Sequence, residues 1–409
     1  MKVVLNVNAT PRILTYIPLY LRLKKIADEV VLLFPPGTDV SEVISLGVGE
    51  NDILFLESDR LSEIKGLDVF VSAESTMSSI PNNCVAIGLI HSLPLKGELN
   101  FDYSTVLRLK PNILLNFDYL ILPIRQEDEF WCPHRYERHV RGVVPDRMKR
   151  SSRLGILQGG YPKIDFLKNQ FAQRKSCGKY IIYSPTNANI SGGEVLKYGE
   201  LIISVLLNEF PDKTVVFRPY PGNLIPFISS FKENSRFIID NSETGLKYQK
   251  DAFLTVTDNS SSSITFSFSS LIPSIFVELE KSSLINGAGG EVDSVHKLGF
   301  GFHVRSISGF TAALKELKSQ KDDWPSIIND FGAKRLANFQ CASEAIADFI
   351  VDSKRNENPK LLWVSSEPSK IEYNAEKIQE ILCKGKAPNR WQADFMKKIK
   401  EYHCKGEIL

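Results

Sequence analysis

Residues 255–277 read TVTDNSSSSITFSFSSLIPSIFV, and the order of polar and apolar residues in this stretch indicates the class of the fold. An apolar run ends at Asp258, four serines follow, and a second apolar run ends at Val277. We interpret the stretch as a strand, a polar turn, a helix over 263–272 and another strand, although the β-branched and aromatic residues of the helical part favour strands. A strand, a helix and a strand in succession predict two parallel strands of one sheet.

Short apolar runs of the same kind recur along most of the chain. Runs of four to eight residues, rich in Val, Ile and Leu, alternate with helical segments. Examples are KVVLN at 2–6, EVVLLF at 29–34, YIIY at 180–183 and KTVVF at 213–217. Strands that are buried on both faces have this composition, because helices cover both sides of a parallel sheet. The sequence therefore predicts an α/β fold with parallel sheets.

The chain is long enough for two doubly wound domains and a further section. Its 409 residues exceed one ordinary domain, and the strand–helix rhythm restarts after residue 170. We predict an N-terminal domain over 1–168, a second domain over 178–330 and a helical section over 331–409, with a linker within 166–178. A return of the helical section to the first domain is left open.

Composition and charge exclude several functional classes. The 50 Lys and Arg residues nearly balance 48 Asp and Glu residues, so no nucleic-acid-binding domain is expected. The six cysteines are scattered, without a CxxC pair or a Cys/His cluster at zinc spacing, which is typical of free thiols in a reducing compartment. We expect no secretory signal, because the apolar run in MKVVLNVNATPRI is too short, and no membrane span, because apolar runs elsewhere stop short of the ~18 residues that span a bilayer. We expect a cytoplasmic protein without a metal or a cofactor.

Polar or glycine-rich residues follow five of the predicted strands. These strand ends are His91, Gly159–Tyr161, Ser184–Asn187, Arg218–Tyr220 and Asp258–Ser263. Ligands of doubly wound sheets bind beyond the carboxyl ends of the strands, so these residues are candidates for a site. Serines between a strand and a helix offer hydroxyls and backbone N–H groups to a phosphate. The alternative is that the serines only cap the helix and form a turn, although one cap needs only one serine.

Six segments within about residues 85–280 carry a resemblance to a known family. The segments are HSLPLK at 91–96, NFDYLILPI at 116–124, GGYPKIDFL at 159–167, YIIYSPTN at 180–187, VVFRPYP at 215–221 and LTVTDNSSSSITFSFSSLIPSIFV at 254–277. In this order they resemble the HGxPxK, WDYLISP, GYPRNDxL, ILYAPTW, LRxHP and LITDYSS motifs of the CDP-glycerol glycerophosphotransferase family. Members of that family are the polyol-phosphate transferases of teichoic-acid and capsule synthesis.

The resemblance implies a GT-B architecture, with two Rossmann-like domains, a cleft between them and the donor nucleotide on the second domain. His91 is implied to be the general base that accepts the proton of the acceptor hydroxyl, and Lys96 to neutralise phosphate charge. The residues implied to bind the donor and its phosphates are Thr186, Arg218, Tyr220, Asp258, Ser260, Ser261 and Ser262. Candidate cleft-lining residues are Ser92, Gly160, Tyr161, Ser184 and Asn187. GT-B enzymes commonly stabilise the leaving diphosphate without a metal, so metal-independent catalysis is expected.

The implied activity is the transfer of glycerol phosphate, or a similar polyol phosphate, from a CDP-activated donor to a hydroxyl of a glycan or lipid-linked acceptor. Two departures from the family motifs leave the identity of the donor open. Tyr220 replaces the His of LRxHP, and Asn259 replaces the Tyr of TDYSS. One alternative is a glycosyltransferase that uses a CMP-activated acidic sugar of the sialic acid or Kdo type for capsule or lipopolysaccharide. Another is a catalytically silent GT-B-like binding protein.

The stretch KGKAPNRWQADFMKKIK at 384–400 combines six basic residues, one acidic residue and a few apolar ones. Trp391 and Phe395 are four residues apart and share a face if the stretch is helical. A basic amphipathic helix lies on anionic membrane surfaces, which predicts peripheral contact with the inner face of the cell membrane. The alternative is that Trp391 and Phe395 pack onto the first domain as part of a closing helix.

Overall fold

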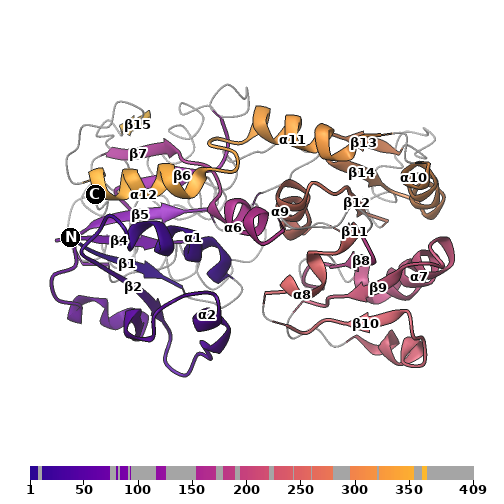
Figure 1. Cartoon of the computed structure of the whole chain (residues 1–409), viewed down its shortest axis with the longest axis horizontal. Coiled ribbons are helices and arrows are strands. Elements are labelled where there is room, and N and C mark those ends of the chain that lie inside the picture. The colour runs from indigo at the N-terminus through magenta and orange to yellow at the C-terminus, as the bar shows by residue number, and fades with distance from the viewer. Residues whose placement is uncertain are drawn as a thin grey trace, which may run out of the picture. The chain divides into compact units, whose positions relative to one another are not determined.

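The computed structural model describes residues 1–7, 12–73, 80–81, 83–90, 93, 117–125, 153–171, 178–188, 194–220, 225–242, 244–258, 260–279, 295–319, 322–353 and 362–365. The chain divides into two compact units, of which the first consists of Met1–Pro162 and Leu336–Leu409 and the second of Lys163–Arg335. Each unit is built on one mainly parallel sheet with helices packed against it (Figure 1). The α/β class with parallel sheets that the sequence predicts is confirmed.

The described part of the first unit contains an eight-stranded sheet in the order β15-β7-β6-β5-β4-β1-β2-β3. Its strands are β1 Lys2–Asn6, β2 Glu29–Phe34, β3 Ile53–Phe55, β4 Val69–Ser72, β5 Val85–Leu89, β6 Tyr119–Leu122, β7 Arg153–Gln158 and β15 Leu362–Ser365. Its helices are α1 Ile13–Leu23, α2 Ser41–Ser45 and α12 Ala342–Asp352, with 3-10 turns η2 Glu50–Asp52 and η3 Ser58–Glu63. All neighbouring strands are parallel except β15, which runs antiparallel to β7.

The second unit contains a seven-stranded sheet among its described residues, in the order β10-β9-β8-β11-β12-β14-β13. Its strands are β8 Tyr180–Tyr183, β9 Thr214–Phe217, β10 Phe237–Ile239, β11 Ala252–Thr257, β12 Ser274–Val277, β13 His296–Leu298 and β14 Gly301–Val304. Its helices are α6 Pro162–Phe171, α7 Glu194–Glu209, η5 Pro226–Phe231, α8 Leu246–Gln249, α9 Ser261–Ser270, α10 Ile307–Lys318 and α11 Trp324–Arg335. Among these seven described strands, the β13–β14 pair alone is antiparallel.

Helix α9 lies between strands β11 and β12, so residues 255–277 form the strand–helix–strand unit that the sequence predicts. Residues 263–270 of the helix are all buried, and ring contacts join Phe266 to Phe171 of α6 and Phe268 to Phe331 of α11. A helix covered on several sides leaves little water for polar groups, so its serines bond within the protein. The hydroxyl of Ser270 donates to the backbone oxygen of Phe266 at 2.6 Å.

The chain enters the second unit at Lys163 and leaves it after Arg335. The structure divides at Pro162 and again at Leu336, whereas the sequence placed the linker within 166–178 and the start of the last section at 331. The last section, which was predicted to be helical, includes a strand: β15 pairs with β7, with Trp363 opposite Gly155. No helix among the described residues is long and apolar enough to cross a membrane.

Candidate functional site

The carboxyl ends of strands β8 and β11 form the switch point of the second sheet. The chain runs from β8 to β9 and β10 on one side, then returns to β11 on the other side of β8 and continues to β12 and β14. Ligands of doubly wound sheets bind at such a reversal, because the loops that leave the two strands diverge there. We call the polar residues that follow β8, β9 and β11 the strand-end cluster, which consists of Ser184, Thr186, Arg218, Asp258 and Ser260.

Asp258 holds the two loops of the switch point together. Its Oδ1 atom accepts a hydrogen bond of 2.8 Å from the backbone N–H of Thr186, and the side chain is only 4% exposed. The neighbouring hydroxyl of Thr257 donates to the backbone oxygen of Ser184 at 2.8 Å. These bonds fix the loop after β8 against the loop after β11. The structure therefore gives Asp258 the role of a bridge between loops.

Ser260 caps helix α9. Its Oγ accepts a hydrogen bond of 3.4 Å from the backbone N–H of Ser262 and lies 2.5 Å from the hydroxyl of Ser262. The backbone N–H of Ser260 in turn donates to Oγ1 of Thr257 at 3.3 Å. The capping role that the sequence left as an alternative is thus present. Ser260 is half-buried and Ser262 is exposed, so both hydroxyls lie at the helix N-terminus where a bound anion is also favoured.

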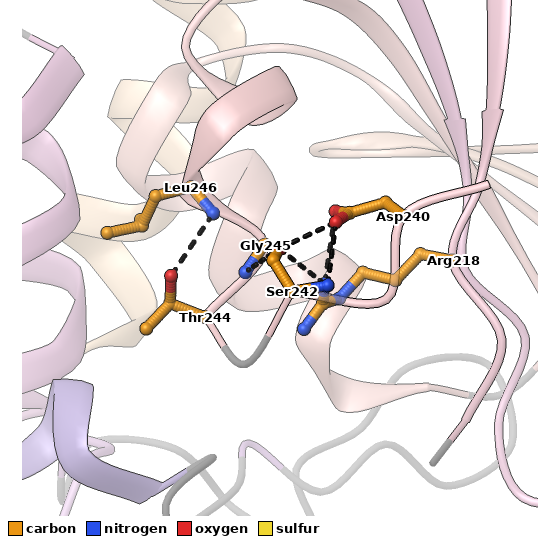
Figure 2. Close-up of polar contacts among 6 residues, drawn as sticks. All are labelled: Arg218, Asp240, Ser242, Thr244, Gly245 and Leu246. Atoms are coloured by element: carbon orange, nitrogen blue, oxygen red, sulfur yellow. Dashed lines mark hydrogen bonds and ion pairs between the residues drawn. The ribbon is translucent and has the colours of Figure 1, made fainter. Parts of the chain in front are cut away.

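Arg218 follows β9, and its guanidinium is held by residues that follow β10 (Figure 2). Its Nη1 donates to Oδ2 of Asp240 at 3.0 Å and to Oγ of Ser242 at 3.3 Å. Asp240 also accepts hydrogen bonds from the backbone N–H and the hydroxyl of Ser242, at 3.0 and 2.6 Å. The side chain of Arg218 is 19% exposed and that of Asp240 is 5% exposed. The arginine is therefore an oriented, half-buried cation beside the switch point.

Gly245 completes the support of Arg218. Its φ of +70° lies in the left-handed region, and a Cβ atom added to it would lie 2.7 Å from Cζ of Arg218. The backbone of Gly245 also donates to Oγ of Ser242 at 3.2 Å. A larger residue at this position would require the guanidinium to shift and would strain the left-handed backbone. Thr244 stabilises the same loop, because its hydroxyl accepts from the backbone N–H of Leu246 at 3.4 Å (Figure 2).

Lys163 lies in the first turn of α6 and is half-buried. Burial, together with repulsion by the positive charge of Arg218, lowers the pKa of its amine from the ordinary 10.5 to about 8. A second cationic side chain therefore lies within electrostatic reach of the strand-end cluster.

The first sheet has a switch point of its own, between β1 and β4. Asn6 ends β1 and Ser72 ends β4, and Nδ2 of Asn6 donates to Oγ of Ser72 at 3.0 Å. Both side chains are buried. Each is a single polar residue at the end of an apolar run, which is too weak a pattern to predict a site from sequence.

Several residues that the sequence predicts for the site are not part of the strand-end cluster. A Cβ on Gly160, whose φ is +92°, would lie 2.3 Å from the backbone oxygen of Ala337, and Tyr161 is buried. Gly160 thus packs within the first unit against the chain where it returns. Tyr220 is 44% exposed, and Asn187 is half-buried after β8. His91, Ser92, Lys96 and the stretch 384–400 lie outside the described residues, and so does the side chain of Ser261.

Sequence reasoning missed Lys163, Asp240, Ser242 and Gly245. Asp240 follows the short run RFII, so the pattern of a polar residue after an apolar run was present in the sequence. Lys163 stands within GGYPKIDFL, where it occupies the position of the arginine in the family motif. No sequence signal connects these residues to Arg218. Among the described residues, His, Cys, Asp and Glu side chains form no group of three or more that could hold a metal ion.

Solved structures are similar to this chain in fold. The wall teichoic acid polymerase TagF matches with a TM-score of 0.57 and 17% sequence identity, over 87% of this chain and 90% of that one. The fold is GT-B-like. MnaA of S. aureus with UDP matches with a TM-score of 0.55 and 13% identity, over 88% of this chain and 98% of that one. A putative UDP-N-acetylglucosamine 2-epimerase of Listeria monocytogenes matches with a TM-score of 0.55 and 12% identity, over 87% and 97% of the two chains.

Sequence comparison adds no closer relationship. No family model matches the chain, and no curated protein matches it. Identities of 12–17% to the solved structures establish the fold, so the function must be argued from the residues of the site.

Proposed function

We propose that the protein is a transferase of cell-surface polymer synthesis that takes glycerol phosphate, or a similar polyol phosphate, from a CDP-activated donor. The acceptor is a hydroxyl of a glycan or lipid-linked chain. The observation that carries the proposal is the polar switch point of the second sheet, where Thr186, Asp258 and Ser260 meet beside Arg218. The GT-B-like fold, which the polymerase TagF shares, supports the same conclusion.

The strand-end cluster has the chemistry to bind the phosphates of a nucleotide. The first turn of α9 provides backbone N–H groups and the hydroxyls of Ser260 and Ser262. Arg218 adds a fixed positive charge, and a guanidinium pairs well with phosphate oxygens. Preorganised donors of this kind stabilise the charge that develops on a leaving nucleotide. The proposal also includes Thr186, Ser261 and Tyr220 among the residues that bind the phosphates.

His91 is proposed to be the general base. Its imidazole accepts the proton of the acceptor hydroxyl while the hydroxyl oxygen attacks the donor phosphorus that carries the polyol. A new oxygen–phosphorus bond forms to the acceptor, the bond to the bridging oxygen of the diphosphate breaks, and CMP leaves. Lys96 and Arg218 offset negative charge on the phosphates. We expect turnover to persist in EDTA, because the proposed charge stabilisation uses side chains and helix N-termini.

A sugar donor is the second candidate. Tyr220 cannot carry the positive charge that a histidine at this position would supply, and two of the structures similar in fold belong to enzymes that bind or are named for UDP compounds. This candidate covers the CMP-activated acidic sugars as well as other nucleotide sugars.

A nucleotide panel tests the proposal. Binding of CMP, CDP and UDP is measured by calorimetry, and CMP release from CDP-glycerol is followed with and without a glycerol-phosphate-primed acceptor. We expect tighter binding of CDP than of UDP, and CMP release that depends on the acceptor. Preference for UDP, or turnover only with a nucleotide sugar, favours the second candidate. Failure to bind any nucleotide favours a silent binding protein.

The basic stretch 384–400 is proposed to contact anionic membrane at the inner face of the cell membrane. Co-sedimentation with vesicles that contain phosphatidylglycerol tests this, and salt should weaken the association. Loss of binding after replacement of the six basic residues by Gln would support the contact. Unchanged binding would contradict it.

A further inference from the structure

Helix α9 provides the first turn of the proposed phosphate site, although its sequence forms helices poorly. It has only ten residues, and all of them are Ser, Thr, Ile or Phe, which are middling helix formers. A helix this short is marginal on its own, so contacts with the rest of the protein hold it in place. Those contacts are made with β11 and β12, the strands that flank the helix in sequence (Figure 1).

Two buried hydroxyls join α9 to strand β12. Oγ of Ser267 lies 2.6 Å from Oγ of Ser274, and the hydroxyl of Ser274 donates to the backbone oxygen of Ser263 at 3.2 Å. A hydroxyl has one proton, so Ser267 donates to Ser274 while Ser274 donates to Ser263. Ser267 and Ser274 are both 0% exposed, so water does not compete for these bonds. We call Ser263, Ser267 and Ser274 the buried serine cluster.

The buried serine cluster reaches the first turn of the helix. Ser263 is the third residue of α9, and Ser274 is the first residue of β12. The backbone N–H of Ser263 donates to the backbone oxygen of Ser260 at 3.2 Å, so the same turn also contains the N-cap. A phosphate binds the N–H groups of a helix N-terminus only when they point toward it. The direction of these groups relative to the sheet therefore depends on the hydroxyl of Ser274.

Other buried hydroxyls nearby do not link the helix to the sheet. The hydroxyl of Ser269 donates to the backbone oxygens of Thr265 and Phe266 in its own helix, at 2.7 and 3.2 Å. Thr255 lies opposite Ser274 on the neighbouring strand and is 2% exposed, and its hydroxyl bonds to no described residue. Ser269 and Thr255 are therefore matched controls, one on the helix and one on the sheet.

We propose that Ser267 and Ser274 position the first turn of α9 so that its N–H groups and hydroxyls meet the phosphates of the ligand. The inference rests on the proposed function for the identity of the ligand, and it adds two positioning residues that do not touch it. The buried carboxylate of Asp258 precedes the turn and disfavours an anion there, so the orientation of the N–H groups has to offset its charge. That charge is the same in every variant below and cancels in the comparison.

The first experiment measures binding of inorganic pyrophosphate, CDP and cytidine by calorimetry. Ser274→Ala and Ser267→Ala each break the link and should weaken pyrophosphate and CDP about 3- to 10-fold. Cytidine carries no phosphate, so its affinity should not change. The double variant should lose less than the product of the two single losses, because both hydroxyls act through one chain of bonds. Ser269→Ala and Thr255→Val should bind all three compounds as the wild type does.

The second experiment measures amide hydrogen exchange without any ligand, so it does not depend on the proposed function. Peptides that cover residues 260–265 should exchange about 3- to 10-fold faster in Ser274→Ala than in the wild type, because the first turn is no longer held against β12. The same peptides should exchange at the wild-type rate in Ser269→Ala.

The outcomes separate this inference from the proposed function. Unchanged exchange, or unchanged affinity for pyrophosphate and CDP, in Ser274→Ala overturns the positioning role while the transferase proposal stands. Equal losses in Ser274→Ala and Ser269→Ala would reflect a general loss of stability and also overturn the role. Faster exchange in Ser274→Ala, with a wild type that binds neither pyrophosphate nor any nucleotide, supports the hold of the buried serine cluster on the turn and contradicts the transferase proposal.

Discussion

Asp258 and Thr186 are 72 residues apart in sequence, and a hydrogen bond of 2.8 Å joins the carboxylate of one to the backbone N–H of the other. The bond links the loops after β8 and β11 at the point where the winding of the second sheet reverses. The carboxylate is buried, so it acts on the geometry of the loops. A ligand at this edge would meet loops that are already fixed, which lowers the entropic cost of binding.

Replacing Asp258 by Ala should destabilise the protein. The change leaves the N–H of Thr186 without this acceptor, and a hydrogen bond to a charged group contributes about 1.5–3 kcal/mol. Asp258→Asn keeps an acceptor oxygen of the same shape and should recover at least half of the loss. Urea denaturation gives both free energies of unfolding. Wild-type stability of Asp258→Ala would show that the bond does not support the loops.

Variants of Ser260 should distinguish a cap from a phosphate ligand. Ser260→Ala removes the cap of α9 and should lower the free energy of unfolding by about 1 kcal/mol, as is usual for N-caps. Ser260→Asp restores a capping oxygen but adds a negative charge where the phosphate is proposed to bind. We expect Ser260→Asp to regain stability and to bind CDP at least tenfold more weakly than the wild type, by calorimetry. Normal CDP affinity in Ser260→Asp would leave the serine as a cap alone.

Gly245→Ala should weaken both stability and anion binding. The new Cβ would lie 2.7 Å from Cζ of Arg218, so the arginine must leave its hydrogen bonds with Asp240 and Ser242. Gly66→Ala is a matched control, because Gly66 has a similar φ of +66° and nothing within 4 Å of the added atom. Backbone strain should cost each variant about 1 kcal/mol, and Gly245→Ala should lose about 1.5–3 kcal/mol more. Equal losses of unfolding free energy in the two variants would show that Arg218 is not held by this contact.

The lowered pKa of Lys163 predicts a pH dependence of stability. Above pH 10.5 the amine is neutral in the folded and the unfolded protein alike, so it has no effect. As the pH falls from 10.5 to about 8, the unfolded chain gains a proton that the folded protein does not, and folding becomes less favourable. Lys163→Met lacks this group, so its stability relative to the wild type should rise over that range and stay constant below it. Parallel stability curves for the two proteins would contradict the shift.

Replacing His91 by Ala should lower turnover by roughly 10²–10⁴, which is the usual contribution of a general base. Donor affinity should change little, because the donor phosphates are proposed to bind the second unit. Initial rates of CMP release and calorimetry with CDP measure the two quantities separately. Near-normal turnover would show that another group accepts the proton.

Local patterns in the sequence predict the α/β class, the position of most strands and the residues that follow them. These features depend on local patterns, since an apolar run of four to eight residues followed by Gly, Pro or Ser reports burial and a turn without reference to the rest of the chain. Asp258, Ser260 and Arg218 were found in this way. The strand β15 was missed, because four residues paired with a strand some 200 positions earlier leave no periodic signal of their own.

The tertiary fold determines which strand ends are neighbours. The order β10-β9-β8-β11 brings Asp240 to Arg218 and Thr186 to Asp258, and no local pattern specifies that order. The close approach of Gly245 to the guanidinium of Arg218 depends on the same long-range pairing. Packing and electrostatics act between atoms that are close in space, so their consequences appear only when segments far apart in the chain are placed together.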